Sequence, residues 1–233
     1  MALFVAISSC NRFELNGWND AMRQTWLQDA KRLGIEYKFF HGEGSEPKDD
    51  VVVLDCADGY EALTWKTREK FKWAYEHGYT DVFHCYHDTY AAVERLLTCG
   101  YENYDFFGEF MDRDGYRFCK SGGGYFISQS AMWHVVNELP EHPNYKGVAE
   151  EDVWVSFIVQ RHPELKVFDA GNQQTMPCLL TPQFEGPRRT NKFITGHLST
   201  IYDPVFKGDG SRESERKYRP EYMFLKHKEW LES

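Results

Sequence analysis

Several protein classes are disfavoured by what the sequence lacks. It contains no hydrophobic stretch long enough to span a bilayer. Its apolar start, residues 1–7, lacks the basic residues that precede the hydrophobic part of a signal peptide, so we expect a first strand there. Internal repeats and low-complexity segments are also lacking. We therefore expect a globular protein without a membrane segment.

Paired cysteines and an excess of positive charge are lacking as well. The six cysteines are scattered and include no C-x-x-C pair, which predicts buried free thiols and a cytoplasmic location. The formal net charge of −9 at pH 7 disfavours nucleic acid as a partner, because binding to the phosphate backbone needs a basic face. An anionic substrate held through a metal ion is compatible with this charge.

Hydrophobic and aromatic residues, in contrast, are abundant. Over 233 residues the hydrophobic content is 42% and the aromatic content is 16%, which suffices for one large α/β domain with a sizeable core. Aromatic side chains stack on sugars and bases, but they also fill cores. Their number alone does not distinguish these two uses.

Strand and helix patterns alternate through the first ninety residues. Short apolar runs predict strands at 3–8, 35–40, 51–54 and 82–86, and helical spacing predicts helices at 18–33 and from Asp58 to Gly78. This alternation is typical of a parallel, Rossmann-like half. Further along, we expect strands at 104–110, 116–120, 125–128 and 166–170, and helices near 91–97, 131–139, 149–154 and 222–231.

Residues 81–90 (D-V-F-H-C-Y-H-D-T-Y) carry the strongest indication of a site. A buried strand here delivers polar residues to the edge of a sheet, where ligands of open α/β proteins bind. Asp88 is a natural ligand for a divalent metal, which can bridge to a diphosphate. Alternatively, Asp88 and Thr89 cap the helix that follows. His84 and His87 form a second possible metal pair with Asp88, although alternation along a strand turns His87 to the other face.

Two further segments combine special residue types. Residues 122–124 are three glycines before an aromatic strand, which allow a close backbone approach to a ligand or, alternatively, form a hinge. Residues 150–152 (E-E-D) begin a helix. Carboxylates there also favour the positive end of the helix dipole, so a purely structural explanation exists for all three.

Five segments, taken in order, resemble motifs of the β1,3-glycosyltransferases, the family that includes the β1,3-galactosyltransferases and the fringe enzymes. They are 22–26 (M-R-Q-T-W), 58–67 (D-G-Y-E-A-L-T-W-K-T), 122–128 (G-G-G-Y-F-I-S), 151–153 (E-D-V) and 195–198 (T-G-H-L). Each motif alone is weak, but five in the same order with similar spacing are hard to obtain by accident. The last segment is closest to the fringe pattern.

The resemblance implies a GT-A fold in which a Rossmann-like half and an acceptor-binding half share one mixed central sheet flanked by helices. For a single domain over 1–233, it implies a nucleotide-sugar-binding half at 1–100, an acceptor and catalytic half at 101–205, and a charged tail with a terminal helix at 206–233. It also implies an inverting displacement of a nucleoside diphosphate from a sugar. Asp152 stands at the position of the family's catalytic base, which deprotonates the acceptor hydroxyl.

The metal motif departs from the family pattern. Where the family has an acidic triplet, this sequence has Tyr86, His87 and Asp88, so only the last acid is kept. The resemblance implies Asp88 and His197 as the two protein ligands of Mn²⁺ or Mg²⁺, and mixed oxygen and nitrogen ligation suits Mn²⁺. Tyr86 and His87 are then expected at the ribose, which leaves the choice of nucleotide open.

The remaining candidates for nucleotide-sugar binding are Arg12, Arg23, Asp58, Lys66, Gly123 and Gly124. Arg12 follows the first strand, at the place where the family binds the base and ribose. Arg23 and Lys66 can pair with a diphosphate or, equally, form structural ion pairs. Asp58 also has the spacing of a capping box with Glu61.

These patterns together predict a metal-dependent glycosyltransferase that uses a nucleoside-diphosphate sugar, with a uridine diphosphate sugar as the expected donor. A glycan, a protein or another hydroxyl compound would be the acceptor, in a bacterium or a virus-infected host cell. One alternative is a non-catalytic nucleotide- or sugar-binding module with a degenerate metal motif. Another is a glycosyltransferase that acts on a modified nucleic-acid base, which the acidic charge disfavours.

Overall fold

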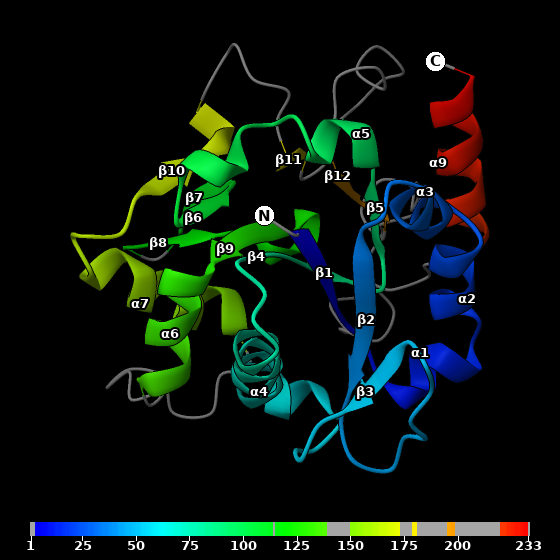
Figure 1. Ribbon diagram of the computed structural model, residues 1–233, viewed down its shortest axis with the longest axis horizontal. Helices are drawn as coiled ribbons and strands as arrows, with labels where there is room; N and C mark the ends of the chain where they lie inside the picture. Colours follow the sequence, from blue (N-terminus) through cyan, green and yellow to red (C-terminus); the bar gives the residue numbers. More distant parts are fainter. Residues whose placement is uncertain are drawn as a thin grey trace.

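A mixed β-sheet forms the centre of the molecule (Figure 1). The structure is a computed structural model that describes residues 3–113, 115–138, 150–172, 179–180, 195–198 and 220–232. Within these ranges the main sheet has seven strands in the spatial order β10 (Val167–Asp169), β6 (Phe106–Gly108), β9 (Tyr125–Ser128), β4 (Asp81–Tyr86), β1 (Leu3–Ser8), β2 (Glu36–His41) and β3 (Val51–Val53).

One strand of the main sheet, β9, runs against the direction of the other six. Strands β3, β2, β1 and β4 are parallel neighbours, as the alternation of strands and helices predicts. Strand β9 runs antiparallel to both β4 and β6. The parallel part and the later strands therefore form one continuous sheet. The expectation of an α/β fold with a mixed central sheet is confirmed.

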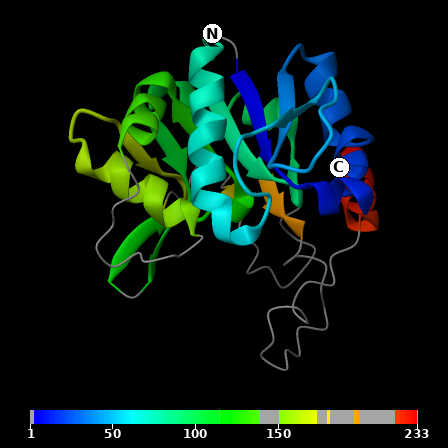
Figure 2. The ribbon, with the colours of Figure 1, turned by 90° about the horizontal axis from the view of Figure 1, so that it is seen from below.

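Helices cover both faces of this sheet (Figure 2). They are α1 (Asn11–Leu15), α2 (Trp18–Arg23), α3 (Trp26–Arg32), α4 (Leu63–Glu76), α5 (Val93–Leu96), α6 (Gln129–Asn137), α7 (Glu151–Arg161) and α9 (Glu221–Leu231). Two smaller sheets accompany them: β11 (Leu179–Leu180), β12 (Thr195–His197) and β5 (Thr89–Ala91) in one, and the hairpin of β7 (Phe110–Arg113) and β8 (Tyr116–Cys119) in the other.

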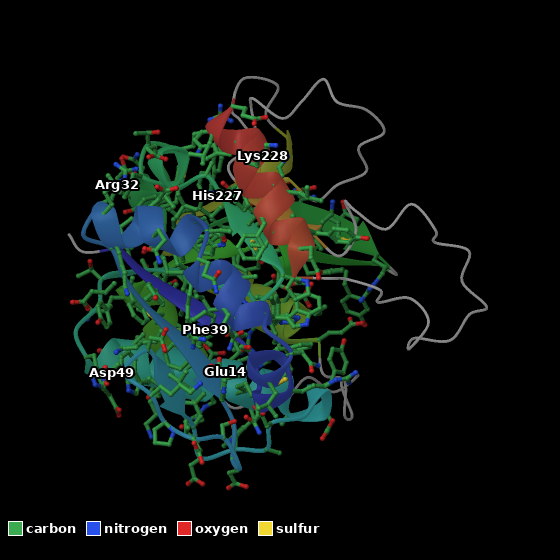
Figure 3. All side chains as sticks on the ribbon, turned by 90° about the vertical axis from the view of Figure 1, so that its right-hand side faces the viewer. Glu14, Arg32, Phe39, Asp49, His227 and Lys228 are labelled. Atoms are coloured by element: carbon green, nitrogen blue, oxygen red, sulfur yellow. The ribbon has the colours of Figure 1, made fainter. Side chains whose placement is uncertain are left out.

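Side chains alternate between two hydrophobic cores along each central strand. In β1, Val5 and Ile7 pack with helices α2, α3, α5 and α9, whereas Phe4 and Ala6 pack with α4, α6 and α7. This follows from the two-residue period of a strand that is buried on both faces. Figure 3 shows α9 beside α2 and α3, and there the ring nitrogen Nδ1 of His227 lies 3.0 Å from the Tyr90 hydroxyl.

The helix predicted at 18–33 is two helices. Thr25 interrupts the pattern, because its hydroxyl donates a hydrogen bond to the carbonyl of Ala21 (2.6 Å) and its backbone leaves the helical region. The break turns Trp26 so that its indole nitrogen donates to the carbonyl of Thr89 (3.0 Å). This bond ties α3 to the segment that follows β4.

Three other predicted elements were wrong in detail. Residues 89–91 form strand β5, so the helix expected near 91–97 contains only Val93–Leu96, and its N-cap is Ala92 rather than Asp88 or Thr89. The strand expected at 104–110 is divided at Glu109 into β6 and β7. Helix α4 begins after a 3-10 turn, Tyr60–Ala62, and Asp58 binds other groups instead of capping it. The charged tail before the terminal helix lies outside the described residues.

The described cysteines and helices agree with the expectation of buried free thiols and with the lack of a long hydrophobic stretch. The five described cysteines are free and four of them are buried, while Cys178 lies outside the described residues. Among the described helices, none has the length and apolar character needed to cross a bilayer.

Gly124 is required by packing, which gives a testable expectation for stability. Its φ is +84°, and an added Cβ would lie 2.5 Å from Cζ of Phe83 and 2.7 Å from the carbonyl oxygen of His84. We expect Gly124→Ala to lower the free energy of unfolding by roughly 3 kcal/mol, as strain and overpacking add. Gly78→Ala is the matched control, because Gly78 has φ +79° but no atom within 4 Å of the added Cβ. It should cost only about 1 kcal/mol in urea denaturation. Equal losses for the two variants would contradict this explanation.

Candidate active site

A pocket of about 380 Å³ lies where β4 ends. Its walls come from the turn after β4, the hairpin β7–β8, the segment before β9 and the beginning of α7. The lining residues are Tyr60, Leu63, Tyr86, His87, Asp88, Met111, Arg113, Phe118, Lys120, Ser121, Gly122, Glu150, Glu151 and Asp152. The carboxyl ends of strands are the usual position of ligand sites in α/β sheets, so this pocket is the candidate active site.

The turn after β4 fixes two of the predicted residues, His87 and Asp88. The backbone nitrogen of His87 donates to the carbonyl of Ser8 (3.2 Å), which holds the turn against the end of β1. The His87 ring stacks on Phe13 with centroids 3.5 Å apart and meets Trp18 edge-on. Asp88 comes next and is 8% exposed. His87 is thus held by aromatic packing, at the pocket wall beside Asp88.

A late segment of the chain lies beside Asp88. Strand β12 pairs antiparallel with β5, so that the backbone of His197 lies opposite Thr89. The next backbone nitrogen, that of Leu198, donates to the carbonyl oxygen of Asp88 (2.9 Å). The structure therefore brings the backbones of both predicted metal ligands together. Their role as ligands stays a prediction.

Glu151 is held in the core beneath the pocket. This carboxylate is 1% exposed, and its two oxygens accept hydrogen bonds from the hydroxyls of Tyr86 and of Tyr125 (3.1 Å). The ring nitrogen Nε2 of His84 lies 3.4 Å from the oxygen that Tyr86 contacts. A buried carboxylate needs such partners, since isolated burial of its charge is costly.

Lys70 completes this buried network. Its ammonium donates to the Ser8 hydroxyl (2.7 Å) and contacts Nδ1 of His84, and both Lys70 and His84 are fully buried. Because Nδ1 faces the ammonium, Nε2 carries the ring proton and faces Glu151. Burial lowers the pKa of Lys70 to about 7. Burial alone would raise the pKa of Glu151, but His84 and Lys70 outweigh it and hold the pKa at about 2.

The pKa of Asp152 is shifted in the opposite direction from that of Glu151. Its carboxylate accepts from the Ser121 hydroxyl (3.2 Å) and from the backbone nitrogen of Val153 (2.9 Å). Burial, followed by the negative charge of Glu151, raises the pKa of Asp152 to about 7. Neighbouring carboxyl groups with pKa values pushed apart are typical of acid–base sites. With these pKa values, Glu151 is ionised at neutral pH, whereas Asp152 titrates near pH 7.

Removal of the Glu151 charge should change the titration of Asp152. We expect Glu151→Gln to lower the pKa of Asp152 below about 7, although burial still keeps it above its ordinary range. A carboxyl ¹³C NMR titration of selectively labelled aspartate measures this directly. Glu150→Gln is the control, because the Glu150 carboxylate pairs with Arg113 and is not among the causes of the Asp152 shift. An unchanged Asp152 titration in Glu151→Gln would refute this coupling.

Two cations stand at the pocket wall. The Arg113 guanidinium on β7 pairs with Glu150, which precedes α7. The Lys120 ammonium lies 2.5 Å from a carboxylate oxygen of Glu109. Acidic side chains nevertheless dominate the lining, with Asp88 and the three acids at 150–152. Such a lining suits an anionic ligand only together with a cation.

Asp58 and Lys66 form a structural pair next to the sheet edge. The Asp58 carboxylate accepts from the backbone nitrogens of Asn11 (2.8 Å) and Gly42 (2.6 Å), and it lies 2.6 Å from the Lys66 ammonium. Lys66 also donates to the carbonyl of Ser9 (3.0 Å). The pair thus ties together the ends of β1 and β2. It supports the position of the site without being among the pocket-lining residues.

The two predicted arginines lie apart from the pocket lining. Arg23 pairs with the carboxylates of Glu14 (3.0 Å), Asp20 (2.8 Å) and Asp50 (2.7 Å), which favours the structural alternative for this residue. Arg12 is exposed on α1. Of the predicted glycines, Gly123 is buried and Gly124 packs on β4, while their neighbour Gly122 lines the pocket.

Sequence reasoning missed the network below the pocket. Lys66 and Lys70 are one helical turn apart on the same face as Phe71 and Ala74, and lysines on the apolar face of a helix indicate buried partners. That signal was present in the sequence. The partners of Lys70 come from β1 and β4, and no local pattern identifies them.

The comparisons with known proteins address the fold. No protein-family model and no curated protein sequence matches the chain. The structure is similar to that of a glycosyltransferase involved in the glycosylation of the major capsid of PBCV-1, with a TM-score of 0.54 and 14% sequence identity over 96% of this chain and 100% of that one. At this identity the likeness shows the fold, and it confirms the expected GT-A architecture.

Two further solved structures are similar with TM-scores below 0.5. One is a Drosophila galactosyltransferase in complex with manganese, UDP-Gal and xylobiose, with a TM-score of 0.49 and 14% identity over 95% of this chain and 84% of that one. The other is a putative nucleotide-diphospho-sugar transferase from Desulfovibrio desulfuricans G20, with a TM-score of 0.46 and 14% identity over 72% of this chain and 80% of that one.

Proposed function

We propose that this chain is an inverting, divalent-metal-dependent glycosyltransferase of the β1,3-transferase type. It transfers a sugar from a nucleoside-diphosphate sugar, with a uridine diphosphate sugar as the expected donor, to an acceptor hydroxyl. The observation that carries the proposal is the Asp152 carboxylate, which lines the pocket with a pKa raised to about 7. The GT-A fold supports the same class of reaction.

In this proposal Asp152 is the general base. The acceptor hydroxyl gives its proton to the Asp152 carboxylate while its oxygen forms a bond to the anomeric carbon of the donor sugar. The bond between that carbon and the diphosphate oxygen breaks, and its electron pair leaves with the nucleoside diphosphate. A base with a pKa near the working pH is suited to this step. The hydrogen bond from Ser121 fixes the direction of the carboxylate.

Asp88 and His197 would hold the divalent cation, with Mn²⁺ or Mg²⁺ as candidates. The donor set fits such an ion, because Asp88 lines the pocket and the strand that carries His197 pairs beside it. When bound, the cation would neutralise the charge of the leaving diphosphate. Tyr86 and His87 occupy the two positions before Asp88, where contacts to the ribose are expected. The acidic pocket lining supports a metal-bound anion over a free one.

A thermal-shift panel of nucleoside diphosphates, with and without Mn²⁺, tests the proposal. A ligand that binds the folded chain raises the melting temperature by mass action. We expect one nucleoside diphosphate at about a hundred times its Kd to raise it by about 5–10 °C, and only when Mn²⁺ is present. Shifts that are the same without the metal, or the absence of any shift across the panel, would refute the proposal.

A further inference from the structure

A second cluster of titratable side chains lies at the C-terminal ends of α6 and α7, away from the pocket. His134 and Glu138 are one helical turn apart at the end of α6, and His162 and Glu164 directly follow α7. The rings of His134 and His162 face each other with centroids 3.6 Å apart. The side chains of His134, Glu138 and His162 are 15%, 24% and 23% exposed, whereas that of Glu164 is 58% exposed, so the first three are partly shielded from water.

Each histidine ring lies between the two carboxylates. On one side, Oε1 of Glu138 lies 3.6 Å from Nδ1 of His134 and contacts Nε2 of His162. On the other side, Oε1 of Glu164 lies 3.5 Å from Nε2 of His134 and 3.2 Å from Nδ1 of His162. One nitrogen of each ring therefore faces Glu138, and the other nitrogen of each ring faces Glu164.

This arrangement has the donor groups of a metal centre with an outer carboxylate. The ligand atoms of His134, Glu138 and His162 all lie within 4.8 Å of one another. Around a tetrahedral Zn²⁺, ligand atoms at about 2.0–2.2 Å from the ion lie about 3.4 Å apart, so small side-chain movements suffice. Histidines that bind a metal usually donate their other N–H to a carboxylate, and Glu164 stands where such a carboxylate is needed.

We propose that His134, Glu138 and His162 bind one Zn²⁺ ion, with Glu164 holding the outer nitrogens of both rings. Two imidazoles and one carboxylate are ligands that zinc prefers. Arg161 leaves this donor set intact, because its guanidinium lies 3.5 Å from Oε2 of Glu138 while Oε1 faces the histidines. The fourth position of the ion is left for water or a further ligand.

The alternative is a cluster of ion pairs with protonated histidines. The geometry favours the metal site, because one nitrogen of each ring faces Glu138 and the other nitrogen of each ring faces Glu164. A divalent ion bound at the Glu138 side accepts lone pairs from both rings while leaving them neutral.

The site has a structural consequence for the pocket at the other end of α7. This helix spans Glu151–Arg161, so the zinc ligands lie about 15 Å from Asp152 along its axis. An ion bound there fixes the end of α7 to the end of α6. The proposed function does not depend on it.

Zinc titration of the full chain tests this inference. After removal of metals with EDTA, isothermal titration with ZnCl₂ is carried out in an Asp88→Ala, His197→Ala background, which removes the proposed donor cation site. We expect one Zn²⁺ per chain, lost in His162→Ala and in His134→Ala. Glu164→Gln should keep this stoichiometry but weaken the affinity by about 10- to 100-fold. His77→Ala is the control, because His77 is exposed at the end of α4 and should leave binding unchanged.

Separate measurements distinguish a loss of folding from a loss of metal binding in the variants. Circular dichroism shows whether each variant is folded. If a histidine variant is unfolded, Glu138→Gln, which keeps the shape of the side chain, takes its place in the zinc titration. Co²⁺ then serves as a second probe, since tetrahedral coordination gives strong visible absorption bands. Failure of the background chain to bind Zn²⁺, or full binding in folded variants of the three ligands, would overturn the inference. Neither result would bear on nucleotide binding at the pocket.

Discussion

Asp152→Asn is expected to lower the rate of sugar transfer by about 10²- to 10⁴-fold, the range that general-base catalysis contributes. The amide cannot accept the proton of the acceptor hydroxyl, but it keeps the size of the carboxylate and its contact with Ser121. Binding of the nucleoside diphosphate with Mn²⁺ should therefore remain close to wild type. Steady-state kinetics together with a nucleotide titration measure the two effects separately.

The same assignment predicts how kcat/KM of the wild-type enzyme depends on pH. The base must be ionised to accept a proton, and the pKa of Asp152 is raised to about 7. The value of kcat/KM should therefore be highest above pH 7 and fall tenfold per unit as the pH decreases below it.

Asp112→Asn is the matched control for Asp152→Asn, because Asp112 is 72% exposed on the hairpin. A similar loss in both variants, or an Asp152→Asn enzyme with full activity, would rule out the assigned base.

Asp88→Ala is expected to abolish the effect of Mn²⁺ on nucleotide binding and to lower the rate by about 10³-fold. The loss is large because the diphosphate leaves with a charge that a cation must neutralise, a contribution of several kcal/mol. The affinity for the nucleoside diphosphate in Mn²⁺ should fall to the value measured without the metal. Isothermal titration with and without Mn²⁺ measures this difference.

Asp112→Ala serves as the control for that variant as well, since it removes an exposed carboxylate from the same chain. It should leave the response to Mn²⁺ intact. An Asp88→Ala protein that still binds the nucleotide more tightly in Mn²⁺ would require a different metal ligand. The proposal would then lose its cation site while the assignment of Asp152 remained open to its own test.

The central strands were predictable because burial on both faces gives short apolar runs that end in turn residues. The run at 82–86 is followed closely by Asp88, and the structure places that residue at the pocket as expected. The acids at 150–152 were also located from the sequence, at the start of α7. Both signals are local, which is why the sequence alone contained them.

The elements that sequence reasoning missed depend on contacts between distant residues. Thr25 divides a continuous helical pattern, and the break turns Trp26 so that it bonds to Thr89, which lies 63 positions later. Strand β5 exists because β12 pairs with it, although its own sequence also suits the start of a helix. Hydrophobic periodicity does not record such pairings.

The different surroundings of the Glu151 and Asp152 carboxylates could not be predicted from the sequence either. Adjacent carboxylates at a helix start look equivalent in the sequence, and the helix dipole suits both. Only the structure reveals that Glu151 points to His84 in the core, while Asp152 faces Ser121 at the pocket. The resemblance to the β1,3-glycosyltransferases had implied Asp152 as the base.

The release of nucleoside diphosphate from a nucleotide sugar is the measurement that tests the central claim most directly. The wild-type chain, incubated with sugars of the nucleoside diphosphate that the thermal-shift panel identifies, should release that nucleoside diphosphate only in the presence of Mn²⁺ or Mg²⁺. Asp88→Ala should release none above background, and Asp112→Ala should match the wild type. Tight nucleotide binding without turnover in the wild type, with or without an acceptor, would contradict the account and indicate a non-catalytic binding module.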